Sequence, residues 1–248
     1  MNPVLFQFQS FTVYTFGFAI TLASLISVFL LWRRMKKFGY EDESIIDMVI
    51  FSGFLALIFA RLFYVLAHWE DFSGSILKIV LVTYFPGLDG VGALLGIIIA
   101  VGSFTLIKRW TPLVVLDSVF FSLGLGIFVT MLGSFFSGSL PGIPTDSNFG
   151  VAYPGLEGLR HPISLYWMII SIIFYVLVVF IDRKNNKKGL ITSIFLIIYG
   201  VSLGFLQIYS VERLILAGVS ISLVLSILMT VLGVLLMYLV FLKSKKAN

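Results

Sequence analysis

The sequence predicts an all-α integral membrane protein, a bundle of seven transmembrane helices. Three observations predict it: the composition, the length of the apolar stretches and the placement of the basic residues. Of the 248 residues, 59% are hydrophobic and 12% are charged, whereas a soluble domain has roughly 45–50% and about 25%. The mean hydropathy is +1.08. This composition lacks the polar surface that a soluble enzyme or a disordered protein requires, so both classes are excluded.

The apolar stretches are long enough to cross a bilayer, whose hydrocarbon core of about 30 Å requires about 20 residues of helix. The third stretch is the shortest of them. Because the stretches make up most of the chain, we expect residues 1–248 to form a single transmembrane domain with short connections. The expected spans are residues 11–32, 45–67, 90–107, 113–136, 163–181, 189–209 and 217–242.

Basic residues gather in clusters that follow the first, third, fifth and seventh spans. With seven spans, all of these clusters fall on one side of the membrane, and the positive-inside rule makes that side cytoplasmic. We therefore expect the N-terminus outside and the C-terminus in the cytoplasm. The net charge of +5 then belongs to the membrane edge, next to anionic lipid head groups, and no nucleic-acid partner is expected. The clusters hold 13 of the 17 Lys and Arg residues: Arg33, Arg34, Lys36, Lys37, Lys108, Arg109, Arg183, Lys184, Lys187, Lys188, Lys243, Lys245 and Lys246.

The connection between the fourth and fifth helices is expected to be an irregular, Gly/Pro-rich loop on the outer face. Residues 134–162 contain four of the seven prolines of the chain, together with several glycines. This density of Pro and Gly predicts turns rather than helix. A long loop at a membrane edge is commonly functional, and a plain extracellular connection is the alternative.

Polar residues within the predicted spans are few, and two of them are singled out. Arg61 lies deep in the second span with Tyr64 nearly one turn further on. An arginine in hydrocarbon is costly and faces the bundle interior or a polar cavity, and snorkelling to the outer head groups is the alternative. Asp117 is expected to be solvated in the first turn of the fourth helix. Gly92 and Gly96 form a ridge of small residues, which predicts close helix packing.

The sequence Arg160-His161-Pro162 stands at the expected start of the fifth helix. A cation followed by an imidazole at an outer helix N-terminus suits an anionic head group. Proline at the first helical position is equally explained as a simple helix start.

Several segments, in the same order along the chain, resemble the prolipoprotein diacylglyceryl transferases, bacterial enzymes that lipidate lipoprotein precursors. The run from Arg160 to Tyr166 matches the family pattern Arg-His-Pro-x-x-Leu-Tyr. The Ala-Arg-Leu-x-Tyr-Val stretch at Arg61 is similar to the second helix of the family. Further similar segments are Gly92–Gly96, Leu132–Ser139, Pro144-Thr145-Asp146 and Tyr199-Gly200.

The resemblance implies transfer of the diacylglyceryl group of phosphatidylglycerol to the thiol of a lipobox cysteine in a prolipoprotein. The partners would be the phospholipid, the lipoprotein precursor and the membrane, with no metal and no other cofactor. The location would be the bacterial cytoplasmic (inner) membrane, in several passes, with the active face toward the outer side. The resemblance implies a catalytic role for His161 and substrate-binding roles for Arg61, Tyr64, Asp146, Arg160, Tyr166 and Tyr199.

The chain departs from the family at positions that carry its polar signature. Val91 stands where the family has histidine and Met131 where it has arginine. Elsewhere Ser134 and Ser137 replace asparagines, Ser139 replaces a glutamate, and Leu203, Gln207 and Ser210 replace arginine, glutamate and arginine. The alternatives are a non-catalytic member that binds phospholipid or precursor, and a small membrane transporter. A transporter would keep paired ionisable groups near the bilayer midplane.

Overall fold

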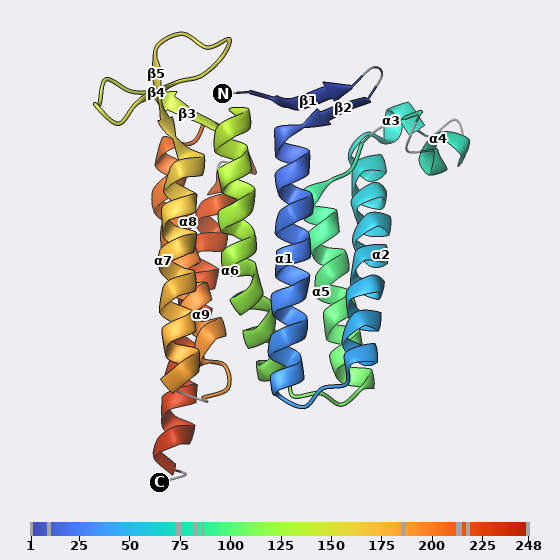
Figure 1. The fold of residues 1–248 in the computed structure, drawn as a ribbon, viewed down its shortest axis with the longest axis vertical. Helices are drawn as coiled ribbons and strands as arrows, with labels where there is room; N and C mark the ends of the chain where they lie inside the picture. The colour runs from blue at the N-terminus through green and yellow to red at the C-terminus, as the bar shows by residue number, and fades with distance from the viewer. Residues whose placement is uncertain are drawn as a thin grey trace. The chain divides into compact units, whose positions relative to one another are not determined.

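The structure, a computed structural model, describes residues 2–8, 11–72, 76–81, 84–85, 87–184, 187–211, 215–216 and 219–246. The chain divides into two compact units, Met1–Arg33 with Leu116–Asn248, and Arg34–Val115. Among the described residues, six helices are long and apolar enough to cross a membrane, and Gly92–Ile107 is a shorter apolar helix. This confirms a helical membrane protein, while the seventh span and the orientation stay predictions. Figure 1 shows the order of the elements.

The first predicted span begins too early. Strands β1 (Val4–Phe8) and β2 (Phe11–Tyr14) pair as an antiparallel hairpin. Helix α1 begins only at Thr15 and ends at Lys37. The sequence of β2 is Phe-Thr-Val-Tyr, four residues that favour strands because their branched or aromatic side chains fit a pleated surface. An apolar stretch alone does not separate such a strand from the helix that follows it.

The unit Arg34–Val115 is built on two helices that pack along each other, α2 (Asp42–Ala67) and α5 (Gly90–Ile107). A Cβ atom at Gly92 or Gly96 would collide with backbone atoms of α2, so the predicted ridge of small residues is confirmed as the contact line. Two short helices, α3 (Trp69–Phe72) and α4 (Ile76–Val80), follow α2.

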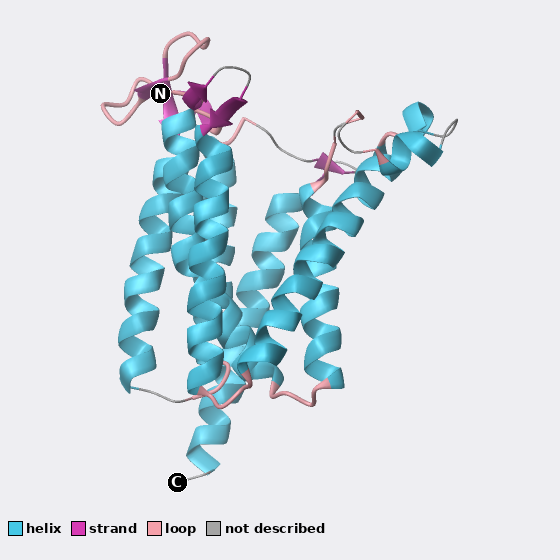
Figure 2. Cartoon of the chain, turned by 45° about the vertical axis from the view of Figure 1, so that its right-hand side comes forward, coloured by secondary structure: helices cyan, strands magenta, loops and turns pink. Residues whose placement is uncertain are grey.

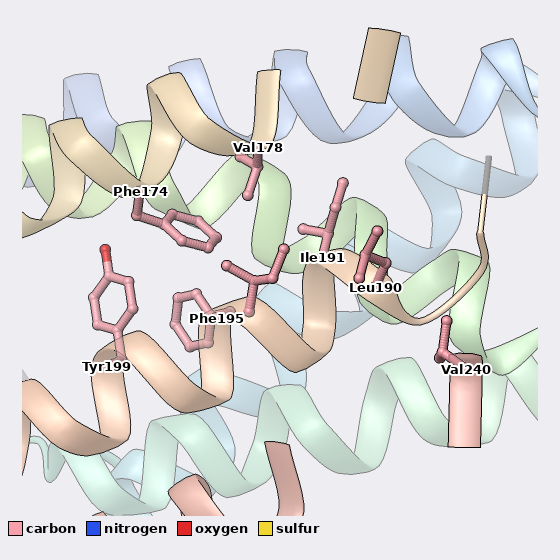
Figure 3. Packing of buried hydrophobic residues seen from close by; sticks show 8 residues of the cluster. Phe174, Val178, Leu190, Ile191, Phe195, Tyr199 and Val240 are labelled. Atoms are coloured by element: carbon pink, nitrogen blue, oxygen red, sulfur yellow. The ribbon is translucent and has the colours of Figure 1, made fainter. Parts of the chain in front are cut away.

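The other unit contains most of α1 and most of α6 (Pro112–Ser137). It also contains α7 (Ile163–Lys184), α8 (Leu190–Leu206), the 3₁₀ turn η1 (Gln207–Tyr209) and α9 (Ile221–Lys246). Its apolar core joins α7, α8 and α9, as Figure 3 shows. Aromatic rings fill this core: Phe195 stacks on Tyr199 at 4.1 Å between ring centroids and on Phe120 of α6 at 4.3 Å. The core residues are Phe174, Val178, Leu190, Ile191, Ile194, Phe195, Tyr199 and Val240.

Asp117 is not solvated, contrary to the expectation from the sequence; it is 3% exposed. Its carboxylate accepts hydrogen bonds from the backbone N–H groups of Gly189 (2.7 Å) and Thr192 (2.8 Å) and from the Thr192 hydroxyl (2.6 Å). The first N–H groups of a helix have no partner within the helix. Asp117 of α6 therefore caps the N-terminus of α8, a role that its own place in α6 does not reveal.

The predicted irregular loop after α6 contains a small antiparallel sheet. Strand β5 (Leu159–Pro162) lies between β3 (Pro141–Pro144) and β4 (Val151–Ala152). Figure 2 shows these strands in magenta beyond the ends of α6 and α7. The loop is thus less irregular than predicted, because the short strands β3 and β4 both pair with β5. A further pair, β6 (Ile215–Leu216) and β7 (Val219–Ser220), precedes α9.

Candidate functional site

Strand β5 carries Arg160 and His161 and leads directly into α7 at Ile163. Because β5 is the central strand, Arg160 is held from two sides: it is paired with Pro144 of β3 and with Val151 of β4. Arg160 and His161 are therefore not at a helix N-terminus, as the sequence suggested, but on a strand just before it. We call the group of Gly142, Arg160, His161, Tyr166 and Tyr209 the β5 site.

Two tyrosines surround the imidazole of His161. The His161 Nδ1 atom and the Tyr166 hydroxyl lie 3.0 Å apart in a hydrogen bond in which either group can donate. The ring of Tyr209, in η1, lies 4.6 Å from the imidazole between centroids. Tyr166 is one of the residues that the family resemblance marks, and Tyr209 is not. With Nδ1 engaged, Nε2 is the ring nitrogen that can exchange a proton with a substrate.

Arg160 retains hydrogen-bonding capacity. Its Nη1 donates to the carbonyl oxygen of Gly142 at 3.3 Å, and its Nε is buried with no partner among the described residues. A guanidinium has five N–H donors in a planar fork that matches phosphate oxygens. Arg160 can therefore bind an anionic group.

Gly142 of β3 joins the site to the end of α8. A Cβ atom there would lie 2.6 Å from the carbonyl oxygen of His161 and 2.8 Å from that of Tyr209, and Gly142 pairs with Ser210 in an isolated β-bridge. Only glycine allows these backbones to approach so closely. This contact brings Tyr209 to the site from a distant part of the chain.

Two further hydroxyls lie buried close to β5. The Tyr153 hydroxyl lies near that of Ser164, and neither oxygen makes a hydrogen bond of good geometry with another described residue. Burial raises the pKa of Tyr153 above its ordinary value of 10.0, because the phenolate is poorly solvated there. Tyr153 is therefore a neutral donor throughout the physiological pH range.

A small cavity of about 140 Å³ opens between α7, α8 and the first turn of α9. Its lining is mainly apolar, and Leu203, Gln207 and Ser210 contribute its α8 and η1 side. The Gln207 amide is engaged, since its Oε1 accepts from Ser220 at 2.8 Å and its Nε2 donates to the Gly204 carbonyl at 3.2 Å. The cavity therefore offers shape and the hydroxyls of Ser210 and Ser222 rather than charge.

The end of α6 carries a group of three linked serines. The hydroxyl oxygens of Ser134 and Ser137 each lie 3.0 Å from that of Ser139, and Ser137 also donates to the Ser134 carbonyl at 3.1 Å. Each hydroxyl thus has a partner within the group.

Arg61 and Tyr64 belong to the other unit, where Arg61 is 8% exposed and each of its three guanidinium nitrogens donates to a backbone group. It donates to the carbonyl oxygens of Lys78 (2.6 Å), Ile79 (2.7 Å) and Gly87 (3.0 Å). Its guanidinium also lies over the Phe72 ring at 4.9 Å. The buried placement of Arg61 is confirmed and snorkelling is not observed. Its contacts hold the segment after α2 in place.

A match to a family of known proteins covers almost the whole chain. The sequence profile of the prolipoprotein diacylglyceryl transferases matches residues 3–239. The chain belongs to this family. The resemblance read from the sequence is thereby confirmed.

Relatives named phosphatidylglycerol–prolipoprotein diacylglyceryl transferase come from several bacteria. The Clostridium tetani protein is 29% identical over 206 residues, covering 81% of this chain and 82% of the relative. The Finegoldia magna protein is 25% identical over 238 residues, 95% and 94% of the two chains. The Parasynechococcus marenigrum protein is 31% identical over 223 residues, 82% and 77% of the two chains.

The residues that the resemblance assigned to a diacylglyceryl transferase site are only partly brought together. Arg160, His161 and Tyr166 meet in the β5 site. Tyr199 instead lies in the apolar core, 5% exposed, with its hydroxyl donating to Ser171 at 2.9 Å. Asp146 is exposed in the connection between β3 and β4. Within the described residues, no three His, Cys, Asp or Glu side chains could hold a metal ion.

Several signature positions of the diacylglyceryl transferases gather at the end of this unit that carries the β5 site. Ser134, Ser137 and Ser139 form the serine group, and Leu203, Gln207 and Ser210 line the cavity. These positions thus lie together, and Ser139, Leu203, Gln207 and Ser210 are uncharged where the resemblance expects charged residues. Of the two other departures, Met131 is half-buried in α6, and Val91 of α5 lies at a position whose side chain is outside the described part of the structure.

Proposed function

We propose that this protein transfers the diacylglyceryl group of phosphatidylglycerol to the cysteine thiol of a prolipoprotein, with the β5 site as its reaction centre. The observation that carries the proposal is the placement of Arg160 beside His161 on β5. Arg160 offers a buried donor, Nε, with no partner among the described residues. His161 is oriented by Tyr166. The membership of the family, and the names of the relatives, give the reaction class.

In this reaction the cysteine sulfur attacks the glyceryl carbon that is bonded to the phosphate oxygen. A new C–S bond forms and the C–O bond breaks, so that glycerol phosphate leaves with the electron pair of that bond. His161 accepts the thiol proton at Nε2, because the thiolate is the effective nucleophile. Arg160 binds the phosphate as negative charge accumulates on the leaving group.

The basic clusters support an outward-facing site. In the unit that holds the β5 site, α1, α7 and α9 run in the same direction (Figure 1), and their C-terminal parts carry Arg33, Arg183-Lys184 and Lys243. The β5 site lies at the opposite ends of these helices. If the basic ends face the cytoplasm, the site faces the outer leaflet of the cytoplasmic membrane, where a prolipoprotein emerges.

A second candidate function is binding of phospholipid or prolipoprotein without turnover. It is favoured by the cavity lining, where Leu203 and Gln207 stand at positions of charged signature residues. Loss of a single transition-state donor typically lowers the rate by about 10²–10³-fold. Because this chain lacks several such groups, turnover depends on Arg160 and His161 alone.

One assay separates the two candidates. The full chain, purified in a mild detergent, is incubated with phosphatidylglycerol labelled in an acyl chain and with a peptide that contains a lipobox cysteine. The transferase predicts a labelled thioether on the peptide and release of glycerol phosphate. Retention of labelled lipid without either product, in a preparation that gives a single melting transition, contradicts transfer and supports the binding role.

A further inference from the structure

A larger hollow lies away from the β5 site, toward the basic ends of the helices. Along α7, α8 and α9 a groove of about 880 Å³ is lined almost entirely by apolar side chains, among them Ile173, Leu177, Phe180, Ile194, Met237 and Phe241. Its volume falls within the roughly 300–1,000 Å³ of small-molecule sites. The groove lies over the core cluster drawn in Figure 3.

The groove has the length of one membrane leaflet. Its α7 lining runs from Ile172 to Lys184, which is about 18 Å at a rise of 1.5 Å per residue. Half of a hydrocarbon core of about 30 Å is roughly 15 Å. An acyl chain of one leaflet therefore fits along it from the helix ends to the region of the midplane.

One end of the groove is cationic. Lys184 is part of the lining, with its Nζ 5.3 Å from the centroid of the Phe180 ring. Lys187 lies with its Nζ 4.4 Å from the centroid of the Phe241 ring, which also lines the groove. Two ammonium groups thus meet the apolar channel at the helix ends, the arrangement that binds the phosphate of an anionic lipid whose chain lies along the channel.

We propose that this groove is a binding site for an anionic phospholipid of the leaflet at the basic ends of the helices. A second copy of the chain is a poor occupant, because a parallel neighbour brings its own lysines to the same end and the like charges repel. A zwitterionic lipid is also disfavoured, since its ammonium group faces Lys184 and Lys187.

Photolabelling tests this site. The full chain is placed in nanodiscs of phosphatidylcholine that contain a small fraction of phosphatidic acid with a diazirine on one acyl chain, and the labelled peptides are identified by mass spectrometry. Phosphatidic acid separates the test from the proposed transfer, whose substrate is phosphatidylglycerol. We expect labels within Ile173–Phe180 and Met237–Phe241, at yields several-fold above those from a diazirine phosphatidylcholine.

Charge variants give the sharper comparison. Lys184→Ala and Lys187→Ala should each lower groove labelling about fivefold, as expected for one cation near an anionic lipid. Lys243→Ala is the matched control, because Lys243 is exposed at the same end and does not line the groove; it should leave the labelling unchanged. Arg160→Ala should also leave the groove labelling unchanged. Failure of the proposed transfer at the β5 site can thus be distinguished from failure of lipid binding in the groove.

Three outcomes overturn the proposal. Equal labelling by both lipids, with no effect of the lysine variants, makes the groove an ordinary lipid-facing surface. Labels that avoid α7 and α9 place the lipid elsewhere. Crosslinked dimers through these segments show a second copy in the groove.

Discussion

The Nδ1 atom of His161 and the phenolic oxygen of Tyr166 lie 3.0 Å apart across the junction of β5 and α7. The strand fixes one partner and the first turns of the helix fix the other, so the ring orientation of His161 depends on both elements. A base that is held by a second group presents its free nitrogen in one direction.

Replacement of Tyr166 should therefore weaken catalysis without removing it. We expect Tyr166→Phe to lower kcat by about 10–100-fold, the range for partners that orient a functional histidine, with little change in KM. Tyr175→Phe is the control, because Tyr175 lies on the same helix and contacts Phe121. Steady-state kinetics of both variants is the measurement, and an unchanged kcat in Tyr166→Phe contradicts the orienting role.

Gly142 should tolerate no side chain. In Gly142→Ala the new Cβ meets the backbones of His161 and Tyr209, so β3 must move away from β5 and the site opens. We expect transfer, or lipid binding at this site, to fall at least tenfold, as expected when about 1.4 kcal/mol of positioning is lost. Gly17→Ala is a suitable control because nothing lies within 4 Å of its added Cβ. Equal activity of the two variants would show that the contact is unimportant.

Asp117 should be a stability residue. Asp117→Ala leaves two buried backbone N–H groups and the Thr192 hydroxyl without their acceptor, at a cost of about 3 kcal/mol. We expect a clearly lower thermal unfolding midpoint in detergent. Asp47→Ala, which removes an exposed carboxylate of α2, should unfold like the parent. A normal unfolding midpoint with lost activity would instead assign Asp117 to the reaction.

Substitutions of Arg61 distinguish a structural role of this residue from a substrate-binding role. Because its three donors hold the carbonyls of Lys78, Ile79 and Gly87, Arg61→Ala should speed hydrogen–deuterium exchange in α4. Arg61→Lys, with fewer donors and no planar fork, should restore this protection only partly. An altered KM with unchanged exchange in α4 would support the substrate-binding role that the family resemblance assigns to Arg61.

The long helices were predictable because apolar stretches of membrane length leave few alternatives. The predicted spans around α2, α6, α7, α8 and α9 agree with the structure to within a few residues at most ends, and Gly92 and Gly96 marked a real packing line. The predictions fail where the structure depends on pairing between separate segments of the chain. Strands β3 to β5 form because distant segments meet, and residues 11–14 pair with β1 rather than joining α1.

The site was predictable only where a motif carried it. Arg160, His161 and Tyr166 stand close together in one segment, so a local match found them. Tyr209 lies at the site because its backbone packs closely against Gly142. No local sequence pattern predicts this contact. Tyr199 matched the family pattern, but its ring lies in the core. This could not be predicted, because the sequence does not show which face of α8 packs on α7.

The proposed function depends on whether His161 and Arg160 carry out transfer in a site that has lost other charges. The most direct measurement is the rate of thioether formation on a lipobox peptide by the purified parent chain and by His161→Ala and Arg160→Ala. We expect measurable transfer by the parent chain and a rate at least 100-fold lower in each variant, as is typical for loss of a general base or a leaving-group donor. Absence of transfer by a folded parent chain, or transfer that survives both substitutions, contradicts the proposed function.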